Sequence, residues 1–303
     1  MPNAFLKASR IAPTALALLQ REIVLPGLVW TDGLGDFRGA ANDTVSIRVP
    51  ARTTANRRAL RGEGSARQIQ MSSLTETKVD VTLDWDIYNA VPITDEELTL
   101  DIADFGEQVL QPQMRAVAED LENLVAETLQ GATYPPGHDM TFADGKDDIY
   151  GIVVEARAAL SKADVPVGQR FLVVGANVEA AILKTDLFRR VDQSGADSAL
   201  REATIGRIAG FDVVTSNAID PDEAYAFHRT AVVLATRAPV VPAGASDGRS
   251  VESEGFAMRW LRDYDFSQAQ DRSLVDAFAG CSMVTDDGVI KRAVKIVRTT
   301  SGS

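Results

Sequence analysis

Apolar and polar residues alternate along two segments in the first third of the chain, Thr44 to Val49 and Thr75 to Ile87. Successive side chains of a strand point to opposite faces of a sheet, so this alternation predicts two half-exposed strands that pair as a hairpin. About 25 residues separate the two segments, far more than an ordinary hairpin loop, and we expect the connection to be a long projecting arm. On the second segment, the face expected to be buried consists of Val79, Val81, Leu83, Trp85 and Ile87.

A long helix is predicted to follow this hairpin. Thr94, with Glu97 three residues later, has the pattern of a helix N-cap followed by acids in the first turn. Apolar residues recur at steps of three and four over residues 102–130, which predicts one helix roughly 40 Å long. Pro112 is expected to kink or divide this helix, because proline lacks the backbone N–H that a helix interior requires.

The remainder of the chain has the pattern of mixed helices and strands, without an internal repeat. Short apolar runs bounded by glycine predict buried strands, and the last fifty residues are mostly strand-like. The predicted elements are a helix over 149–162, a strand over 171–174, a helix over 177–184 capped by Asn177, a glycine-punctuated strand-like segment over 206–216 and strands over 255–297.

Composition narrows the class of protein. The 303 residues are 45% apolar and 24% charged, which suffices for one large core or two modest ones. The net charge of −12 argues against a primary nucleic-acid binder, although a container wall for nucleic acid is compatible with it. Cys281 is the only cysteine, so internal disulfides are excluded, and we expect it to act as a small core residue. No apolar run approaches the length that spans a bilayer, so cytoplasmic folding is expected.

No constellation of residues indicates catalysis. His138 and His228 lack metal-binding spacing and are expected at the surface or an interface. Residues 244–248 match a nucleophile-elbow pattern around Ser246, but no histidine follows, as hydrolases of that type require. Three aspartates within 144–148 lack EF-hand spacing and are interpreted as a solvated turn. The sequence therefore predicts a protein that is not an enzyme and has no catalytic, cofactor-binding or metal-binding residues.

Charge is distributed unevenly around the predicted hairpin. Residues 52–67 carry five arginines against Glu63, a net charge of +4, whereas residues 75–107 hold ten acids against Lys78. The simpler interpretation is a solvated loop beside a solvated acidic face. The sharper one is that the basic arm of one subunit lies over the acidic segment of its neighbour, where complementary charge selects partner and register.

The order of these parts resembles that of the major capsid protein of tailed bacteriophages, which has the Hong Kong ninety-seven type fold. The resemblance covers essentially the whole chain, and four stretches also resemble the coat proteins of short-tailed phages. None of the similar stretches is a catalytic signature. They are Ala15 to Glu22, Val91 to Glu97, Ile205 to Val213 and Gly255 to Trp260.

The resemblance implies an α+β chain with five segments. These are an N-terminal arm at 1–44, an extended β-hairpin arm at 45–93, a peripheral domain with a spine helix at 94–148, an axial α/β domain at 149–249, and returning peripheral strands with the C-terminus at 250–303.

The implied function is that of a major capsid protein. Copies would form pentamers and hexamers of an icosahedral virion shell, assembled in host cytoplasm around double-stranded DNA that is enclosed without sequence-specific binding. A separate scaffolding protein, a portal protein and a possible decoration protein are the implied partners. The candidate contacts between subunits are Arg52, Arg57, Arg58, Arg61 and Arg67 on the arm, facing Asp95, Glu96, Asp101 and Asp104.

Two alternatives remain at the level of sequence. An encapsulin-like bacterial compartment shell shares this fold and would hold enzyme cargo in place of DNA. A soluble α/β hydrolase or binding protein would remain a small oligomer, whereas a shell protein would sediment as a particle.

Overall fold

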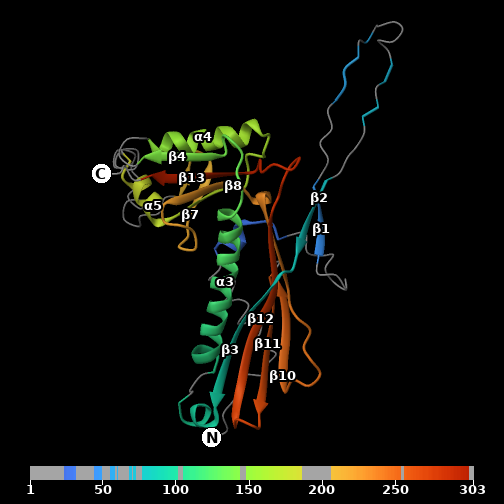
Figure 1. Cartoon of the computed structure of the whole chain (residues 1–303), viewed down its shortest axis with the longest axis vertical. Coiled ribbons are helices and arrows are strands. Elements are labelled where there is room, and N and C mark those ends of the chain that lie inside the picture. The colour runs from blue at the N-terminus through green and yellow to red at the C-terminus, as the bar shows by residue number, and fades with distance from the viewer. Residues whose placement is uncertain are drawn as a thin grey trace.

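The computed structural model describes residues 24–31, 44–49, 55–58, 60, 68–69, 71–72, 77–101, 105–143, 148–185, 206–253 and 256–299. Figure 1 shows these residues as an elongated body: a long sheet lined by one helix, a second sheet with two helices at one end, and a hairpin that projects to the side. The mixture of helices and strands agrees with the α+β class predicted above.

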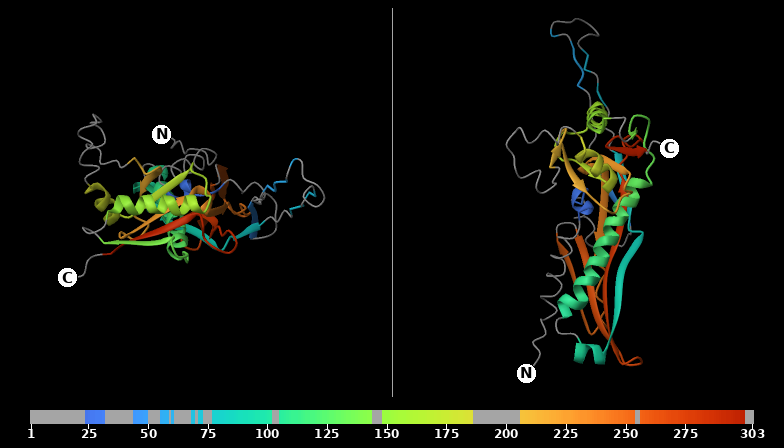
Figure 2. Two further views of the ribbon diagram at one scale, coloured as in Figure 1. Left: turned by 90° about the horizontal axis from the view of Figure 1, so that it is seen from above. Right: turned by 90° about the vertical axis from the view of Figure 1, so that its left-hand side faces the viewer.

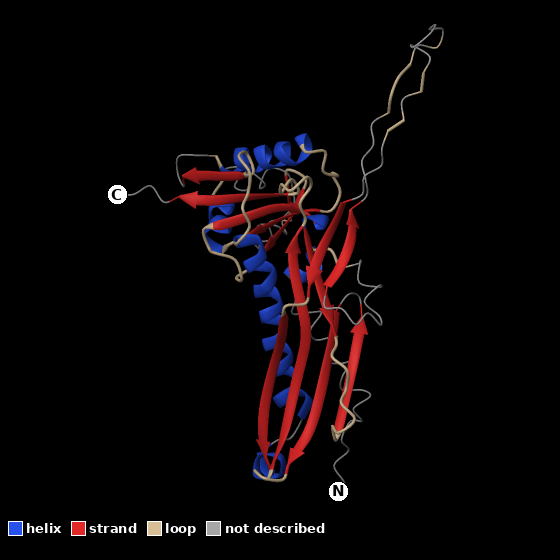
Figure 3. Ribbon diagram, turned by 45° about the vertical axis from the view of Figure 1, so that its right-hand side comes forward, coloured by secondary structure: helices blue, strands red, loops and turns tan. Residues whose placement is uncertain are grey.

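The long sheet is antiparallel and is organised around one central strand. That strand, β12 (Gln270–Met283), pairs along its first ten residues with β3 (Trp85–Thr94) and along its end with β9 (Val232–Arg237). On the side of β12 away from β3, which is also the side of β9, β11 (Phe256–Asp265) pairs with β12 and then with the edge strand β10 (Asp247–Ser253). The lengths of β3, β11 and β12 make this part of the molecule narrow and tall (Figure 3).

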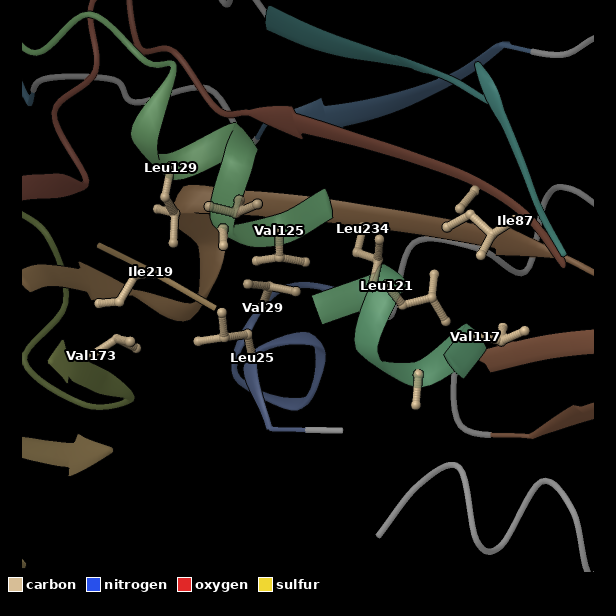
Figure 4. Packing of buried hydrophobic residues seen from close by; sticks show 14 of the residues in the cluster. Leu25, Val29, Ile87, Val117, Leu121, Val125, Leu129, Val173, Ile219 and Leu234 are labelled. Atoms are coloured by element: carbon tan, nitrogen blue, oxygen red, sulfur yellow. The ribbon is translucent and has the colours of Figure 1, made fainter. Parts of the chain in front are cut away.

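The predicted long helix lies along one face of this sheet as α3 (Gln111–Gln130). Its apolar side chains, at steps of three and four, are buried against β12 and β3, and the largest of them are at most 1% exposed. Figure 4 shows four of these side chains in one cluster with residues of the short helix α2 (Leu25–Leu28), of β3 and of β9. The buried residues are Met114, Val117, Leu121, Val125 and Leu129.

The start of this helix differs from a regular α-helix. Described helical residues run from Phe105, and residues 106–110 form a π-helical turn in which the Gln111 N–H donates to the Gly106 carbonyl five residues back. Pro112 follows at once. Because proline has no N–H and its ring crowds the carbonyl four residues earlier, the wider turn relieves the contact. Pro112 therefore marks the junction between the π-turn and the α-helix, while residues 102–104 lie outside the described part.

The second sheet has six strands of mixed direction. Its helices are α4 (Ile149–Lys162), which begins at the N-cap Asp148, and α5 (Ala176–Leu183). The helix α4 packs on β4, β13 and β8, and together these elements enclose a second core. In spatial order the strands are β4 (Asp139–Ala143), β13 (Ala293–Thr299), β8 (Glu223–His228), β5 (Arg170–Val174), β7 (Phe211–Thr215) and β6 (Arg207–Ile208).

Strand pairing divides the chain differently from the expected segments. The last strand, β13, pairs with β4 and β8 in the six-stranded sheet, not with β10 to β12, although residues 250–303 were expected to group together. Likewise β4 lies in the six-stranded sheet and β9 in the long one. These pairings join residues more than 40 positions apart, so a local sequence pattern does not reveal them.

Two expectations for single residues, Asn177 and His228, are wrong. Asn177 does not cap α5: Gly175 is the N-cap, and the Asn177 side chain donates to Asp222 Oδ1 at 2.9 Å. A side chain at position 175 would meet the Asp220 carbonyl at 2.3 Å, so the position requires glycine. His228 is buried, 5% exposed, and not at the surface. Its burial, with Arg292 and Arg170 nearby, lowers its pKa.

Cys281 packs against the main core, as expected for a small apolar residue. Burial of its thiol raises the pKa of Cys281 to about 12, so the sulfur stays protonated and unreactive at neutral pH. Among the residues that the structure describes, no helix has the length and apolar character needed to cross a membrane.

Candidate assembly surface

The predicted hairpin is present as β1 (Thr44–Val49) and β2 (Thr77–Thr82), paired antiparallel in the register Thr44 opposite Thr82. Beyond it, the described residues of the connection extend away from both sheets (Figures 1 and 2). The two limbs remain adjacent there, since Asn56 Nδ2 donates to Ser72 Oγ at 3.4 Å. The described residues between 44 and 82 therefore form one projecting unit, which we call the arm.

Exposed side chains on the described part of the arm are both basic and apolar. Arg57 and Arg58 are exposed. Leu60 and Met71 are each 92% exposed and Ile69 is 69% exposed, which is unusual for large apolar side chains in a folded chain. The other predicted arm contacts, Arg52, Arg61 and Arg67, lie outside the described residues.

The base of the arm is held by a small core of its own. Val79 and Val81 pack with Val233, Ala235 and Val284, so β2 is joined to β9 and to the segment after β12. The chain then leaves β2 at residues 83–84 and enters the long sheet as β3. This transition explains a wrong prediction: the neighbours that bury Val79 and Val81 do not cover Trp85, which is 59% exposed.

One glycine permits the crossing of β2 over the central strand. A Cβ at Gly280 would lie 1.8 Å from the Thr82 carbonyl oxygen and 2.8 Å from its carbonyl carbon. Because both atoms belong to backbone, no side-chain rotation relieves the overlap. Gly280 therefore sets how closely the arm approaches the body.

The end of β3 and the helix start that follows it, which carries the predicted partners Asp95 and Glu96, lie at the opposite end of the molecule from the described part of the arm (Figure 1). The helix start has the predicted capping geometry: the Glu97 N–H donates to Thr94 Oγ1 at 3.3 Å, and the Thr94 N–H donates to Glu97 Oε2 at 2.9 Å. Asp95 accepts a hydrogen bond from Tyr264 Oη at 2.8 Å, and Glu96 is exposed. The side chain of Asp101 and all of Asp104 lie outside the described part. The arm and the acidic helix start are close in the sequence, but they do not lie together within one subunit.

The turn between β11 and β12 forms the tip of the long sheet. Phe266 is 90% exposed there, with its ring against Tyr264 at 5.0 Å between centroids. Asp265 accepts hydrogen bonds from the Ser267 backbone N–H at 2.9 Å and from Ser267 Oγ, and it pairs with Arg272 at 3.5 Å. The carboxylates at this tip are therefore largely engaged within the subunit.

The face of the long sheet opposite α3 carries a group of residues that the sequence analysis did not single out. In adjoining rows of the sheet, Asp86 is opposite Phe278, and Tyr88 is opposite Asp276. Tyr88 is 66% exposed and Phe278 is 36% exposed. We call these four residues, with Arg259, the aromatic–carboxylate face. The sequence contained one sign of this face: Tyr88 is aromatic, although the alternating pattern of apolar and polar residues predicts a polar residue at this position.

Two of the charged side chains on this face, Arg259 and Asp276, form an ion pair. Arg259 pairs with Asp276 as its cross-strand neighbour, with Nε to Oδ1 at 3.0 Å, and the Asp276 side chain is only 3% exposed. Arg259 Nη1 also donates to the Val240 carbonyl at 2.6 Å. Desolvation and the nearby Asp276 raise the pKa of Asp86, partly offset by Arg259. Asp276 is thus satisfied within the subunit, whereas Asp86 lies beside two exposed aromatic rings.

The motifs examined for chemistry have ordinary structural roles. Ser246 Oγ donates to Asp263 Oδ1 at 2.9 Å, and the residues after it enter strand β10, whereas a nucleophile elbow leads into a helix. His138 Nδ1 lies 2.9 Å from the Ala293 carbonyl. Asp148 accepts from the Tyr150 N–H at 3.1 Å as the cap of α4, and residues 144–147 lie outside the description. Within the described ranges, no three His, Cys, Asp or Glu side chains are grouped as metal ligands.

Solved structures with the same fold come from bacteriophages and from a virus-like particle. A structure from Mycobacterium phage Che8 is 20% identical, with a TM-score of 0.63 and 90% coverage of each chain. The capsid of Ralstonia phage GP4 is 13% identical, with a TM-score of 0.63 and coverage of 87% of this chain and 86% of that one. A virus-like particle from Pyrococcus furiosus is 13% identical, with a TM-score of 0.52 and coverage of 95% and 98%.

No curated protein matches the sequence. The model of a protein family described as phage capsid protein, however, matches residues 78–276, which is more than half of the chain. That range begins in the arm and includes most of the long sheet, α3 and most of the six-stranded sheet. The chain therefore belongs to the phage capsid protein family, and it is a major capsid protein that forms the shell of the virion.

Proposed function

We propose that copies of this chain close into pentamers and hexamers that build an icosahedral head around double-stranded phage DNA. Each contact between neighbours would then be heterologous, joining one surface of a subunit to a different surface of the next. Family membership favours this function over the encapsulin-like compartment and the soluble hydrolase. The net charge of −12 suits a wall that encloses DNA without binding its sequence.

We propose that the arm joins neighbouring subunits. Its described residues extend away from the body while presenting Arg57, Arg58 and large apolar side chains to solvent. An isolated subunit gains nothing from exposing such side chains, whereas a neighbour in a shell would cover them. We therefore keep the five predicted arginines as contact candidates.

The remaining expectations complete the proposed assembly. The six-stranded sheet with α4 and α5 would act as the axial domain, and the long sheet with α3 as the peripheral domain. A separate scaffolding protein, a portal and a possible decoration protein would act with the shell, and assembly would take place in host cytoplasm. The protein's part in this is structural, and we propose that it needs no catalytic step, cofactor or metal.

Reversing the charge of the arm tests this function. The variant R57E/R58E/R61E should fold normally, by circular dichroism, but yield at least about tenfold fewer particles on sedimentation with scaffold, because complementary charge guides association. The control R57K/R58K/R61K keeps the charge and should assemble. Normal particle yield from the reversed variant would refute the contact assignment, and a wild-type chain that stays a small oligomer would refute the shell proposal itself.

A further inference from the structure

The chain passes from the six-stranded sheet to the long sheet through a short turn that begins at a buried histidine. Strand β8 ends at His228, a 3₁₀ turn follows at Arg229–Ala231, and β9 begins at Val232. His228 is 5% exposed, and Ala231 and Val232 belong to the main core. The turn is also joined to the segment after β12, because the Val284 N–H donates to the Ala231 carbonyl at 2.8 Å. Its conformation therefore affects how the two sheets are positioned against each other.

The hydrogen bonds of His228 require a neutral ring. Its Nδ1 caps the turn by accepting from the Thr230 backbone N–H at 3.2 Å, and Nδ1 also lies 2.9 Å from Thr230 Oγ1. Because a backbone N–H only donates, Nδ1 is the unprotonated nitrogen of the neutral ring. An imidazolium carries a proton on both nitrogens, so its Nδ1 is not an acceptor. Protonation of His228 therefore removes the cap of the turn that joins the sheets.

The charged groups around His228 come from three parts of the chain. Arg292, just before β13, donates from Nη1 to the hydroxyl that also contacts the histidine ring. Arg229, on the turn itself, donates from Nε to the Val29 carbonyl at 3.3 Å. Asp286 is held by Arg292 through both carboxylate oxygens, at 2.7 Å from Nε and 2.6 Å from Nη2. This carboxylate is therefore engaged before any charge forms on the histidine.

The third group, Arg170, makes a further positive charge unfavourable. It lies on β5 directly opposite His228 in the sheet register and is 1% exposed. Burial of the ring, with Arg292 and Arg170 nearby, lowers the pKa of His228, although a hydrogen bond to the Gly168 backbone partly offsets this. Among the described residues, the acceptors of the Arg170 guanidinium are all neutral: the carbonyls of Pro166, Arg157 and Val165 and the hydroxyl of Ser161.

We propose that protonation of His228 opens the turn at Arg229–Ala231 and loosens the join between the two sheets, so that the fold of the subunit responds to pH. The inference goes beyond the proposed function, because it concerns the single subunit whether or not a shell forms. The unfolded chain takes up a proton on this residue at about pH 6.5, and the folded chain resists it. The stability that depends on the neutral ring is therefore complete above about pH 6.5 and is lost as the pH falls through that value toward the lower pKa of the folded chain.

The two histidines of the chain provide a matched pair of variants. His228→Asn keeps an oxygen that accepts the Thr230 N–H but does not titrate, whereas His138→Asn leaves the buried ring intact. Between about pH 7.5 and about pH 5.5, the unfolding equilibrium constant of the wild-type subunit should rise about tenfold more than that of His228→Asn, since one proton is linked to unfolding. Urea titrations measure this, and His138→Asn should keep the pH dependence of the wild type. Equal pH dependence of the wild type and His228→Asn would overturn the proposal.

Two further measurements do not require a stable variant at position 228. The NMR signal of the His228 ring, assigned with His138→Asn, should titrate at a lower pH in the folded subunit than in the urea-unfolded chain. Cys281 lies opposite Leu234 of β9 and has a buried thiol, so it reports on the join. Its protection against a pyridyl disulfide, relative to the unfolded chain at the same pH, should fall several-fold over the same pH range. An unshifted ring titration, or unchanged protection of the thiol, overturns the proposal and leaves the shell function untouched.

Discussion

A buried amide holds α3 in position on the long sheet. Gln113 is 1% exposed, and its Nε2 donates to the carbonyls of Asn89 at 3.1 Å and Ser273 at 3.0 Å. Its Oε1 accepts from Ser273 Oγ at 2.7 Å, and that hydroxyl accepts from Trp260 Nε1 at 3.1 Å. The network joins the helix to three strands, so it favours one register of helix on sheet over apolar packings of similar energy.

Gln113→Met should keep the volume of this side chain but remove its hydrogen bonds. Two buried carbonyls and the Ser273 hydroxyl then lose partners, and we expect the free energy of unfolding to fall by about 2 kcal/mol. Urea denaturation of the unassembled subunit measures this. Gln111→Met, at an exposed position two residues earlier, should change it by less than about 0.5 kcal/mol. Equal effects of the two substitutions would mean that the network contributes nothing.

At the scale of elements, a close backbone crossing lies where the described part of the arm meets the body. β2 passes over β12 where Gly280 faces the Thr82 carbonyl, and only five buried side chains form the core at the arm's base. The direction of the arm therefore depends on this crossing more than on the arm's own sequence.

Gly280→Ala should displace β2, because its Cβ would overlap backbone atoms of Thr82. We expect destabilisation of about 2 kcal/mol or more, with a larger loss in particle yield as the arm changes direction. Gly244→Ala is the control, since an added Cβ there meets nothing within 4 Å. Urea midpoints and electron micrographs of both variants provide the measurement, and particles of normal size and yield from Gly280→Ala would contradict it.

At the scale of the whole molecule, the two sheets are joined by a shared core. The main cluster includes Val117 and Leu121 of α3, Trp260 of the long sheet, and Tyr225 and Phe227 of the six-stranded sheet. Ser216, in the loop after β7, also donates to Glu122 of α3 at 2.8 Å. None of the described arm residues belongs to this cluster, so the described part of the molecule consists of one cooperative body and one weakly anchored projection.

Hydrogen exchange of the unassembled subunit should reflect this division. Amides of β1 and β2 are expected to exchange by local opening, well before those of α3, β12 and β8, which should exchange together because they share a core. Mass spectrometry of proteolytic fragments resolves the two groups. If β8 exchanged much faster than α3, the sheets would be separate cooperative units.

Local patterns predicted much of the fold. The hairpin limbs, the Thr94 capping box, the extent of α4 and the buried stripe of α3 agree with the sequence, because each depends on contacts within a few residues or on strict periodicity. The candidate site was predicted less well. Arg57 and Arg58 are exposed on the arm as expected, but the aromatic–carboxylate face combines β3 with β12, about 190 positions apart in the chain.

The sequence by itself determined the types of element, the charge of the arm and the lack of a catalytic motif, since these are properties of neighbouring residues. Only the tertiary structure decided that β13 lies in the six-stranded sheet, that His228 is buried and that Trp85 is exposed. It also placed the basic arm and the acidic helix start at opposite ends of the subunit. The physical reason is common to all four: burial and charge proximity depend on which distant strands pair, and a local pattern is compatible with several such pairings.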